Sequence, residues 1–565
     1  MERKEFISSF FTAGAYKNEA LKKNAGVLDI FPIGGTINEY SGGWTTNEAV
    51  HLLKRAMYGA PVEDVSYFMD MGYSAAVDEL VNTVNTNPGE PLKVNATDSS
   101  AAANDPDWSV AIGRTWVNTP TNSNNVNRER RDTIRNWWLY NMITQPRSIE
   151  EKMILFWSNH VTIEFASVGG ALMCYKYMKL LRQYALGNFK TLVKLVTIEP
   201  AMLSYLNGTL NTKTAPDENY ARELQELFTL GKGPDSHYTE DDVKAAARVL
   251  TGYMINTTDA YYVFNSSRHD TNPKEFSSFY NNTVINRPAN EGQLETDDLI
   301  EMIFTKDEVS KNICRRLYRY FVYHDITPET ETNIIGPLAQ TFRNNNYEIK
   351  PVLLQLLKSE HFFNSLQFGD TIKSPLDYTV GLIRECGVRL PPKSNPQLLY
   401  KHLSYLASNF MPSIDQTIGD PNNVSGFLAY YQMPFYDKLW LNTDTFVRRQ
   451  SFIDMMVNNG YSSGGFKTFI DPVAIAFRMS NPADPTALVQ DLNTFFLRRQ
   501  LSQALRDQIK TDILLTGVTD DSYWADAWNA YANNPADLNN YSVVNTRLKS
   551  LVHYFLSKLE EYHLM

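Results

Sequence analysis

The residues with the clearest chemical potential lie in the stretch 216–252, where acidic and basic side chains follow the helical repeat. Glu218, Arg222 and Glu226 are four residues apart, so the guanidinium can lie between two carboxylates on one helix face. Glu223 lies at the border of the apolar face, where a carboxylate is either paired with an arginine or a ligand. We interpret these charges as a structural ion-pair network that holds two helices in register: Glu218, Arg222, Glu223 and Glu226.

Two capped helices are expected to carry these charges. Asp217 precedes the first helix and can accept hydrogen bonds from its free N–H groups, and Gly231 suits its end. Thr239 opens the second helix, with Asp242 three residues later in an arrangement close to a capping box. Gly252 ends that helix, so the stretch is predicted to be a pair of helices joined by a short loop.

Histidines supply the other candidates. His160 falls on the apolar stripe of a predicted helix, where it is either a metal ligand or general base, or a core histidine bonded to a carbonyl. We favour the core histidine, since the sequence shows no partners for it. His269 and Asp270 follow a predicted hairpin and form a second candidate, with an Asp-stabilised turn as the alternative. The pair His324–Asp325 at another helix end is more simply explained as a cap.

The pattern of periodic runs and stops predicts a mainly α fold: an irregular multi-helix globular body with a small β-hairpin and long loops. The hairpin is expected in residues 253–264, which are rich in β-branched and aromatic residues around a polar turn. Residues 84–127 and 411–445 lack periodicity and are expected to be loops. Residues 495–514 are predicted to be one long amphipathic helix with these residues facing solvent: Arg498, Arg499 and Arg506.

The chain is expected to divide into three parts. Residues 1–43 contain two Gly-Gly breaks and are predicted to be an extended N-terminal arm. Residues 44–390 form the main helical domain, and a proline-rich stretch marks its end. Residues 391–565 form a C-terminal helical subdomain packed on the main domain.

Composition limits the functional classes. A net charge of −10 over 565 residues argues against a sequence-independent nucleic-acid binder, which needs a basic face. The three cysteines are far apart, which excludes a zinc knuckle and disfavours a disulfide framework. No apolar run is long enough to span a membrane as a helix. The start, MERKEFISSFFTAG, lacks the apolar core of a secretory signal.

Several segments together resemble a bacterial family known only as domain of unknown function 1800. They lie between about Trp44 and Arg449 and include HLLKRAMYGAP, MILFWSNHVT, DENYARELQELFTLG, YTEDDVKAAARVLTGY, RHDTNPKEF and KSPLDY. The sequence departs from the family pattern at Ser277-Ser278, at Asp420-Pro421 and at Phe427, where the family usually has Trp. A site that depended on those positions would be altered here.

The resemblance implies an α-helical protein, often exported or associated with the bacterial envelope. It also implies a neighbouring gene for a protein related to sulfatases and alkaline phosphatases, which is the expected partner. The periplasm or envelope is therefore the expected location, with the cytoplasm as the alternative if the N-terminus is not an export segment. No reaction is established for the family, so no catalytic residue is carried over.

Three functions are considered. The first, which we favour over an enzyme, is a helical binding and assembly module of the cell envelope that docks a partner protein through its long loops, with no cofactor. The second is a hydrolase with a divalent metal, which requires four side chains to converge in one cleft: His160, Glu223, His269 and Asp270. The third is glycan binding through exposed aromatic residues: Trp108, Trp116, Tyr430 and Tyr431.

Overall fold

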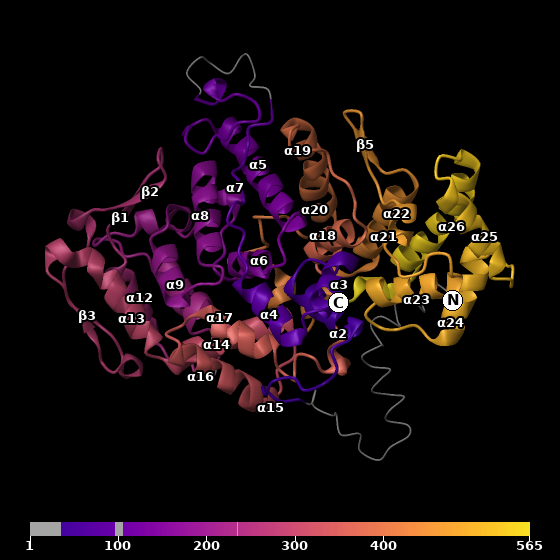
Figure 1. The fold of residues 1–565 in the computed structure, drawn as a ribbon. Coiled ribbons are helices and arrows are strands. Elements are labelled where there is room, and N and C mark those ends of the chain that lie inside the picture. Colours follow the sequence, from indigo (N-terminus) through magenta and orange to yellow (C-terminus); the bar gives the residue numbers. More distant parts are fainter. Residues whose placement is uncertain (1–34, 96–105, 234) are drawn as a thin grey trace.

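The computed structural model describes residues 35–95, 106–233 and 235–565, and it is mainly α-helical, as the sequence predicts (Figure 1). Of the predicted arm at 1–43, the part up to residue 34 lies outside the described residues. The strands of the described residues pair as small antiparallel sheets of two: β1–β2, β3–β4 and β5–β6. The predicted hairpin is confirmed, because β1 (Tyr253–Asn256) pairs with β2 (Tyr261–Phe264).

Helices and short strands of the N-terminal half follow one another along the chain, and the longest connection, between α4 and α5, covers residues 83–123. Their bounds are α2 (Thr46–Ala56), α3 (Val62–Met69), α4 (Tyr73–Asn82), α5 (Asn124–Ile143), α6 (Glu150–His160), α7 (Phe165–Val168), α8 (Ala171–Gln183), α9 (Phe189–Thr197), α10 (Pro200–Tyr205), α11 (Glu218–Glu223), α12 (Glu240–Val249), β3 (Lys274–Glu275) and β4 (Val284–Ile285).

The C-terminal half continues in the same way. Its elements are α13 (Glu295–Phe304), α14 (Asp307–Phe321), α15 (Pro328–Thr330), α16 (Gly336–Asn344), α17 (Ile349–Leu357), α18 (Pro375–Glu385), α19 (Pro396–Ser404), α20 (Met411–Ser413), α21 (Thr443–Asn458), β5 (Tyr461–Ser463), β6 (Phe466–Thr468), α22 (Pro472–Ala476), α23 (Pro485–Phe496), α24 (Gln503–Ile509), α25 (Ser522–Asn533) and α26 (Leu538–His553). Within the described ranges, no helix is both long and apolar enough to cross a bilayer.

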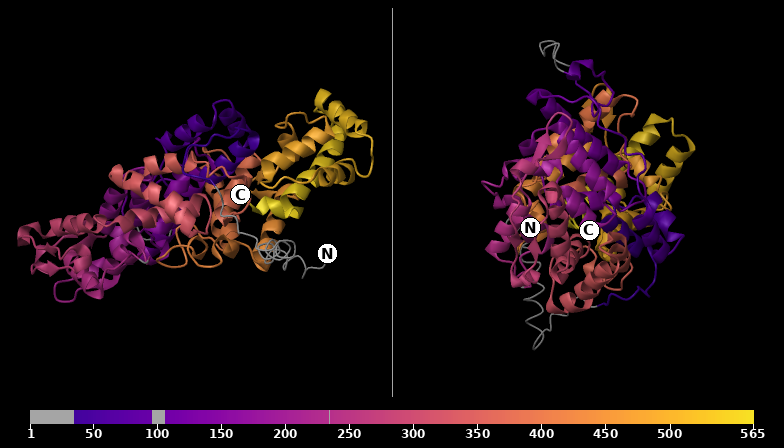
Figure 2. Two further views of the ribbon diagram at one scale, coloured as in Figure 1. Left: turned by 90° about the horizontal axis from the view of Figure 1, so that it is seen from below. Right: turned by 90° about the vertical axis from the view of Figure 1, so that its left-hand side faces the viewer.

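One contiguous hydrophobic core runs through both predicted helical parts. Its buried side chains extend from Ala49 to Tyr562 and include residues on either side of position 391. Direct contacts cross the same boundary: Lys54 of α2 donates a hydrogen bond to the carbonyl of Phe496 at 3.4 Å. The molecule is elongated, with the β1–β4 hairpins at one end and α24–α26 at the other (Figure 2). The two parts are therefore joined by shared packing.

The predicted single helix over 495–514 is wrong. Helix α23 ends at Phe496, and α24 begins only at Gln503. The side chain of Asn493 stabilises the break, because its Oδ1 accepts the backbone N–H of Leu501 at 3.0 Å. Arg498 was expected in solvent but is only 3% exposed, and it donates to the carbonyl of Asn47 at 2.9 Å. The sequence keeps its helical repeat across this break, so the repeat alone does not reveal the contact between Asn493 and Leu501.

Candidate functional site

The stretch with the candidate carboxylates folds as two helices, with one departure from the expected geometry. Asp217 caps α11 by accepting the N–H of Asn219 at 2.8 Å, and the capping box of α12 forms between Thr239 and Asp242. After Glu223, however, the helix widens into a π-helical segment over Leu224–Thr229. Segments of this kind are rare and are found frequently at functional sites.

The ion pairs follow from this geometry. Arg222 pairs with Glu218 at 3.1 Å, as the spacing predicts, and reaches Glu240 at the start of α12 at 2.7 Å. Its second predicted partner, Glu226, pairs instead with Lys232 at 2.5 Å. The wider π turn explains this difference, since it moves Glu226 out of the position that an α-helix would give it. Arg222 therefore links α11 to α12. Burial raises the pKa of the neighbouring Glu223, which is half-buried.

His160 lies at the end of α6 and is buried, with its Nε2 atom 2.9 Å from the carbonyl oxygen of Phe228 in the π-helical segment. Burial, and then the charge of Arg316, hold the pKa of His160 well below its ordinary value. The ring is therefore neutral at physiological pH and donates to the carbonyl. This arrangement is that of the carbonyl-bonded core histidine.

His269 and Asp270 are held by separate partners. The Nδ1 atom of His269 lies 3.0 Å from the carbonyl oxygen of Thr251, and its Nε2 atom lies 3.2 Å from Glu295 Oε2. Lys274 also pairs with Glu295, and both of these side chains are fully buried. Asp270 pairs with Arg248 at 2.7 Å. These contacts tie α12 to the start of α13 through the loop between them.

The four predicted site residues therefore have different partners. Among the contacts of the described residues, none joins His160 to Glu223, and none joins either of them to His269 or Asp270. Nowhere in the described ranges do three or more His, Cys, Asp or Glu side chains gather closely enough to hold a metal ion.

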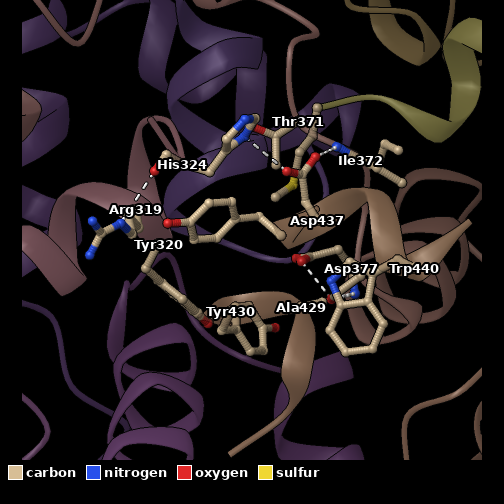
Figure 3. A pocket seen from close by; sticks show the side chains of 13 residues that line it. Arg319, Tyr320, His324, Thr371, Ile372, Asp377, Ala429, Tyr430, Asp437 and Trp440 are labelled. Atoms are coloured by element: carbon tan, nitrogen blue, oxygen red, sulfur yellow. Dashed lines mark hydrogen bonds and ion pairs between the residues drawn. The ribbon is translucent and has the colours of Figure 1, made fainter. Parts of the chain in front are cut away.

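A small cavity lies elsewhere, beside the end of α14 (Figure 3). It leaves about 30 Å³ for the centres of water molecules, room for one or two waters. Its lining comes from three distant segments and the last residue of the chain: Arg319, Tyr320, His324, Thr371, Ile372, Ser374, Asp377, Ala429, Tyr430, Tyr436, Asp437, Trp440 and Met565.

A His–Asp pair lies in the wall of this cavity. The Nδ1 atom of His324 is 3.0 Å from Asp437 Oδ1, and Asp437 Oδ2 accepts the backbone N–H of Ile372 at 2.8 Å (Figure 3). The sequence explained the pair His324–Asp325 as a helix cap, whereas the C-cap residue of α14 is Val322 and His324 contacts Asp437. Arg319 donates from its Nε to the carbonyl of His324 at 3.2 Å, which fixes the chain after α14.

Asp377 supplies a second buried ion pair at the cavity. It pairs with Lys152 of α6, and its other oxygen accepts the hydroxyl of Ser374 at 2.7 Å. Tyr320 donates its hydroxyl to the carbonyl of Lys152 at 3.1 Å. Burial lowers the pKa of Lys152, and the charge of Asp377 opposes that effect. The pair therefore joins α6 to α18 beneath the cavity.

The aromatic residues proposed for glycan binding are dispersed. Trp116 is buried and donates its ring N–H to Thr133 at 2.9 Å, whereas Trp108 is 52% exposed. Tyr430 lines the cavity, and Tyr431 hydrogen-bonds with Asn423 at 2.8 Å. They do not form one exposed aromatic surface.

Sequence reasoning missed the tip of the loop at 422–441. There Met433 is 71% exposed and Phe435 is 51% exposed, while the next two residues, Tyr436 and Asp437, are buried. The surrounding sequence, YYQMPFYDKLW, is rich in aromatic residues, so residue type alone does not separate the exposed tip from its buried flanks. Contiguous exposed apolar surface marks protein interaction sites, and Met433 and Phe435 lie two residues apart at this tip.

The sequence model of a family described as "Protein of unknown function (DUF1800)" matches residues 51–539. The match extends further toward the C-terminus than the resemblance read from the sequence. No curated protein and no solved structure matches the chain.

Proposed function

Since the chain belongs to the DUF1800 family, whose description assigns no activity, we propose that it is a helical binding module that docks a partner protein. The loop at 422–441 is the docking element, and we call it the docking loop. The observation that carries this proposal is the exposure of Met433 and Phe435 at its tip, on a loop whose flanks are fixed in the protein.

The loop is anchored at both sides of the tip. Before the tip, the backbone N–H of Phe427 donates to the side chain of Asn159 at 2.7 Å. After it, Asp437 holds Ile372 and contacts His324. The loop's own side chains Phe427, Ala429, Trp440 and Leu441 pack with Ile372 in a small hydrophobic cluster of their own. A loop that is already ordered loses less conformational entropy when a partner binds, so more of the contact energy appears as affinity.

The alternatives have less support from the same contacts. A hydrolase would require His160, Glu223, His269 and Asp270 in one cleft, and their separate partners favour a structural role for them. Glycan binding would require a shared aromatic surface. The expected partner, from the family resemblance, is an envelope protein related to sulfatases and alkaline phosphatases.

A double substitution tests the docking loop. Met433→Ser with Phe435→Ser should leave the fold intact, because both side chains point into solvent. Hot-spot residues cost more than 1 kcal/mol each when truncated, so the double variant should weaken binding by about 2 kcal/mol, roughly thirtyfold. The measurement is the Kd for the purified protein that copurifies stoichiometrically with the tagged wild type from its own host.

Leu538→Ser is the matched control, since Leu538 is 79% exposed but lies on α26. It should bind the partner as the wild type does. Equal affinity of the wild type and the double variant would refute the docking loop, and a wild type that captures no stoichiometric partner would refute the binding module.

A further inference from the structure

Arg316 on α14 has an environment unlike that of other internal arginines. It is only partly exposed, yet within the described residues it makes no hydrogen bond and lies near no carboxylate. Its neighbour Arg315 shows the contrast, because Arg315 pairs with Glu308 at 2.5 Å and with Glu331 at 2.7 Å. A partly buried charge without a counter-ion is costly, so its retention requires a reason.

The position of Arg316 on α14 gives the direction of its side chain. Asn312, one turn earlier on the same face, donates its side-chain N–H to the carbonyl of Thr229 in the π-helical segment at 2.8 Å. Tyr320, one turn later, packs against Phe156 of α6 with ring centroids 5.4 Å apart. Arg316 therefore faces the seam between α6, the π-helical segment and α14, close to His160, whose pKa its charge helps to lower.

A second arginine lies beside it. Arg319 follows by three residues, which places the two side chains next to each other on the helix surface. Among the described residues, its hydrogen bonding is limited to the Nε atom, which donates to the carbonyl of His324, and its guanidinium carbon lies 5.8 Å from the ring centre of Tyr436. Arg319 also lines the cavity and has no carboxylate partner in the described part of the chain. Two adjacent guanidinium groups thus share one region without compensation.

We propose that Arg316 and Arg319 together bind a doubly charged oxyanion of the phosphate type beside the cavity that Arg319 lines. Guanidinium groups present several N–H donors in a rigid plane, which match the oxygens of phosphate in two-point contacts. Two positive charges require two negative charges for balance, so a dianion fits better than a single carboxylate. Burial, followed by the repulsion from Arg319, lowers the pKa of Arg316 to about 10, which still leaves it charged at neutral pH.

Calorimetric titration with inorganic phosphate at constant ionic strength tests the proposal. The wild type should bind one phosphate saturably and should bind acetate at least tenfold more weakly. Arg316→Met and Arg319→Met should each weaken phosphate binding at least tenfold. Arg128→Met is the matched control and should bind as the wild type does, because Arg128 is an exposed arginine on α5.

Thermal unfolding without phosphate separates a lost ligand contact from a damaged fold. Removing an uncompensated charge should leave the melting temperature of Arg316→Met equal to or above that of the wild type. Arg315→Met should lower it, because Glu308 and Glu331 would lose their partner. Absence of saturable phosphate binding, equal affinity for acetate, or full binding by both the Arg316 and Arg319 variants would each overturn the proposal.

Discussion

Glu295→Gln is the sharpest test of whether the region around His269 is structural. Glu295 is fully buried, and one of its oxygens accepts from both Lys274 and His269, while the other accepts the backbone N–H of Arg287 at 3.0 Å. Glutamine keeps the shape and an acceptor but removes the charge. Lys274, which is fully buried as well, then loses the carboxylate with which it forms an ion pair.

The expected loss follows from this geometry. Removing one partner of a buried ion pair costs about 3–5 kcal/mol, because the remaining charge stays buried without compensation. With a urea m-value of at least about 3 kcal/mol/M for a chain of this size, that loss moves the unfolding midpoint down by at most about 1–2 M. The same chemical change at Glu218, whose pair with Arg222 is half-exposed, should cost about 1 kcal/mol or less.

The assay is urea denaturation of the wild type, Glu295→Gln and Glu218→Gln, followed by circular dichroism. A midpoint shift of Glu295→Gln no larger than that of Glu218→Gln would refute a structural role for the cluster around Glu295.

Acid titration adds a second readout. Burial favours the neutral acid, but the hydrogen bonds from His269 and Lys274 outweigh it and lower the pKa of Glu295. The stabilisation is therefore present above the ordinary pKa of about 4.5 and is lost as pH falls below it, and Glu295→Gln should lack that acid-dependent loss.

Two further predictions concern the cavity region. Burial lowers the pKa of Lys373 to about 7 from its ordinary 10.5, so the unfolded chain binds more protons between these values and wild-type stability should rise with pH above 7. Lys373→Met should remove up to about 1.4 kcal/mol of this rise in the unfolding free energy per pH unit, measured by urea denaturation between pH 7 and 9. An unchanged dependence of the unfolding free energy on pH would contradict the lowered pKa of Lys373. Asp437→Ala removes the acceptor of the Ile372 N–H and should lower the free energy of local unfolding of the docking loop by about 1–3 kcal/mol. Amide hydrogens of the docking loop should then exchange roughly tenfold faster, as measured by mass spectrometry. Asp325→Ala is the control, and equal exchange in both variants would show that Asp437 does not anchor the loop.

The sequence predicted those features of the fold that depend on residues close together in the chain. The capping box at Thr239 and the hairpin at 253–264 depend on residues within a few positions of one another, and both form. The mainly α character follows from many such local signals. The break between α23 and α24 depends on Asn493, whose side chain holds a residue eight positions later. A periodic pattern carries no information about that contact.

The candidate site was less predictable for the same reason. His324 contacts Asp437, and Lys152 pairs with Asp377; both partnerships join residues more than a hundred positions apart. The adjacency of His324 and Asp325 in the sequence carried no information about the contact with Asp437. The tip of the docking loop was missed because exposure, not residue type, distinguishes Met433 from a core methionine.

The distribution of partners among the charged groups bears directly on function. The oxygens of Glu295 and the ring of His269 already form hydrogen bonds inside the protein and are buried, which leaves them little access to a ligand. Glu295 and His269 therefore stabilise the fold. Arg316 is the opposite case, because its guanidinium has donors and a charge that the described part of the chain does not satisfy. Met433 and Phe435 are likewise apolar groups that the fold leaves in water. A binding protein needs charged groups without an internal partner or apolar side chains exposed to water. Here both kinds of group belong to the region where α14 ends and the docking loop packs.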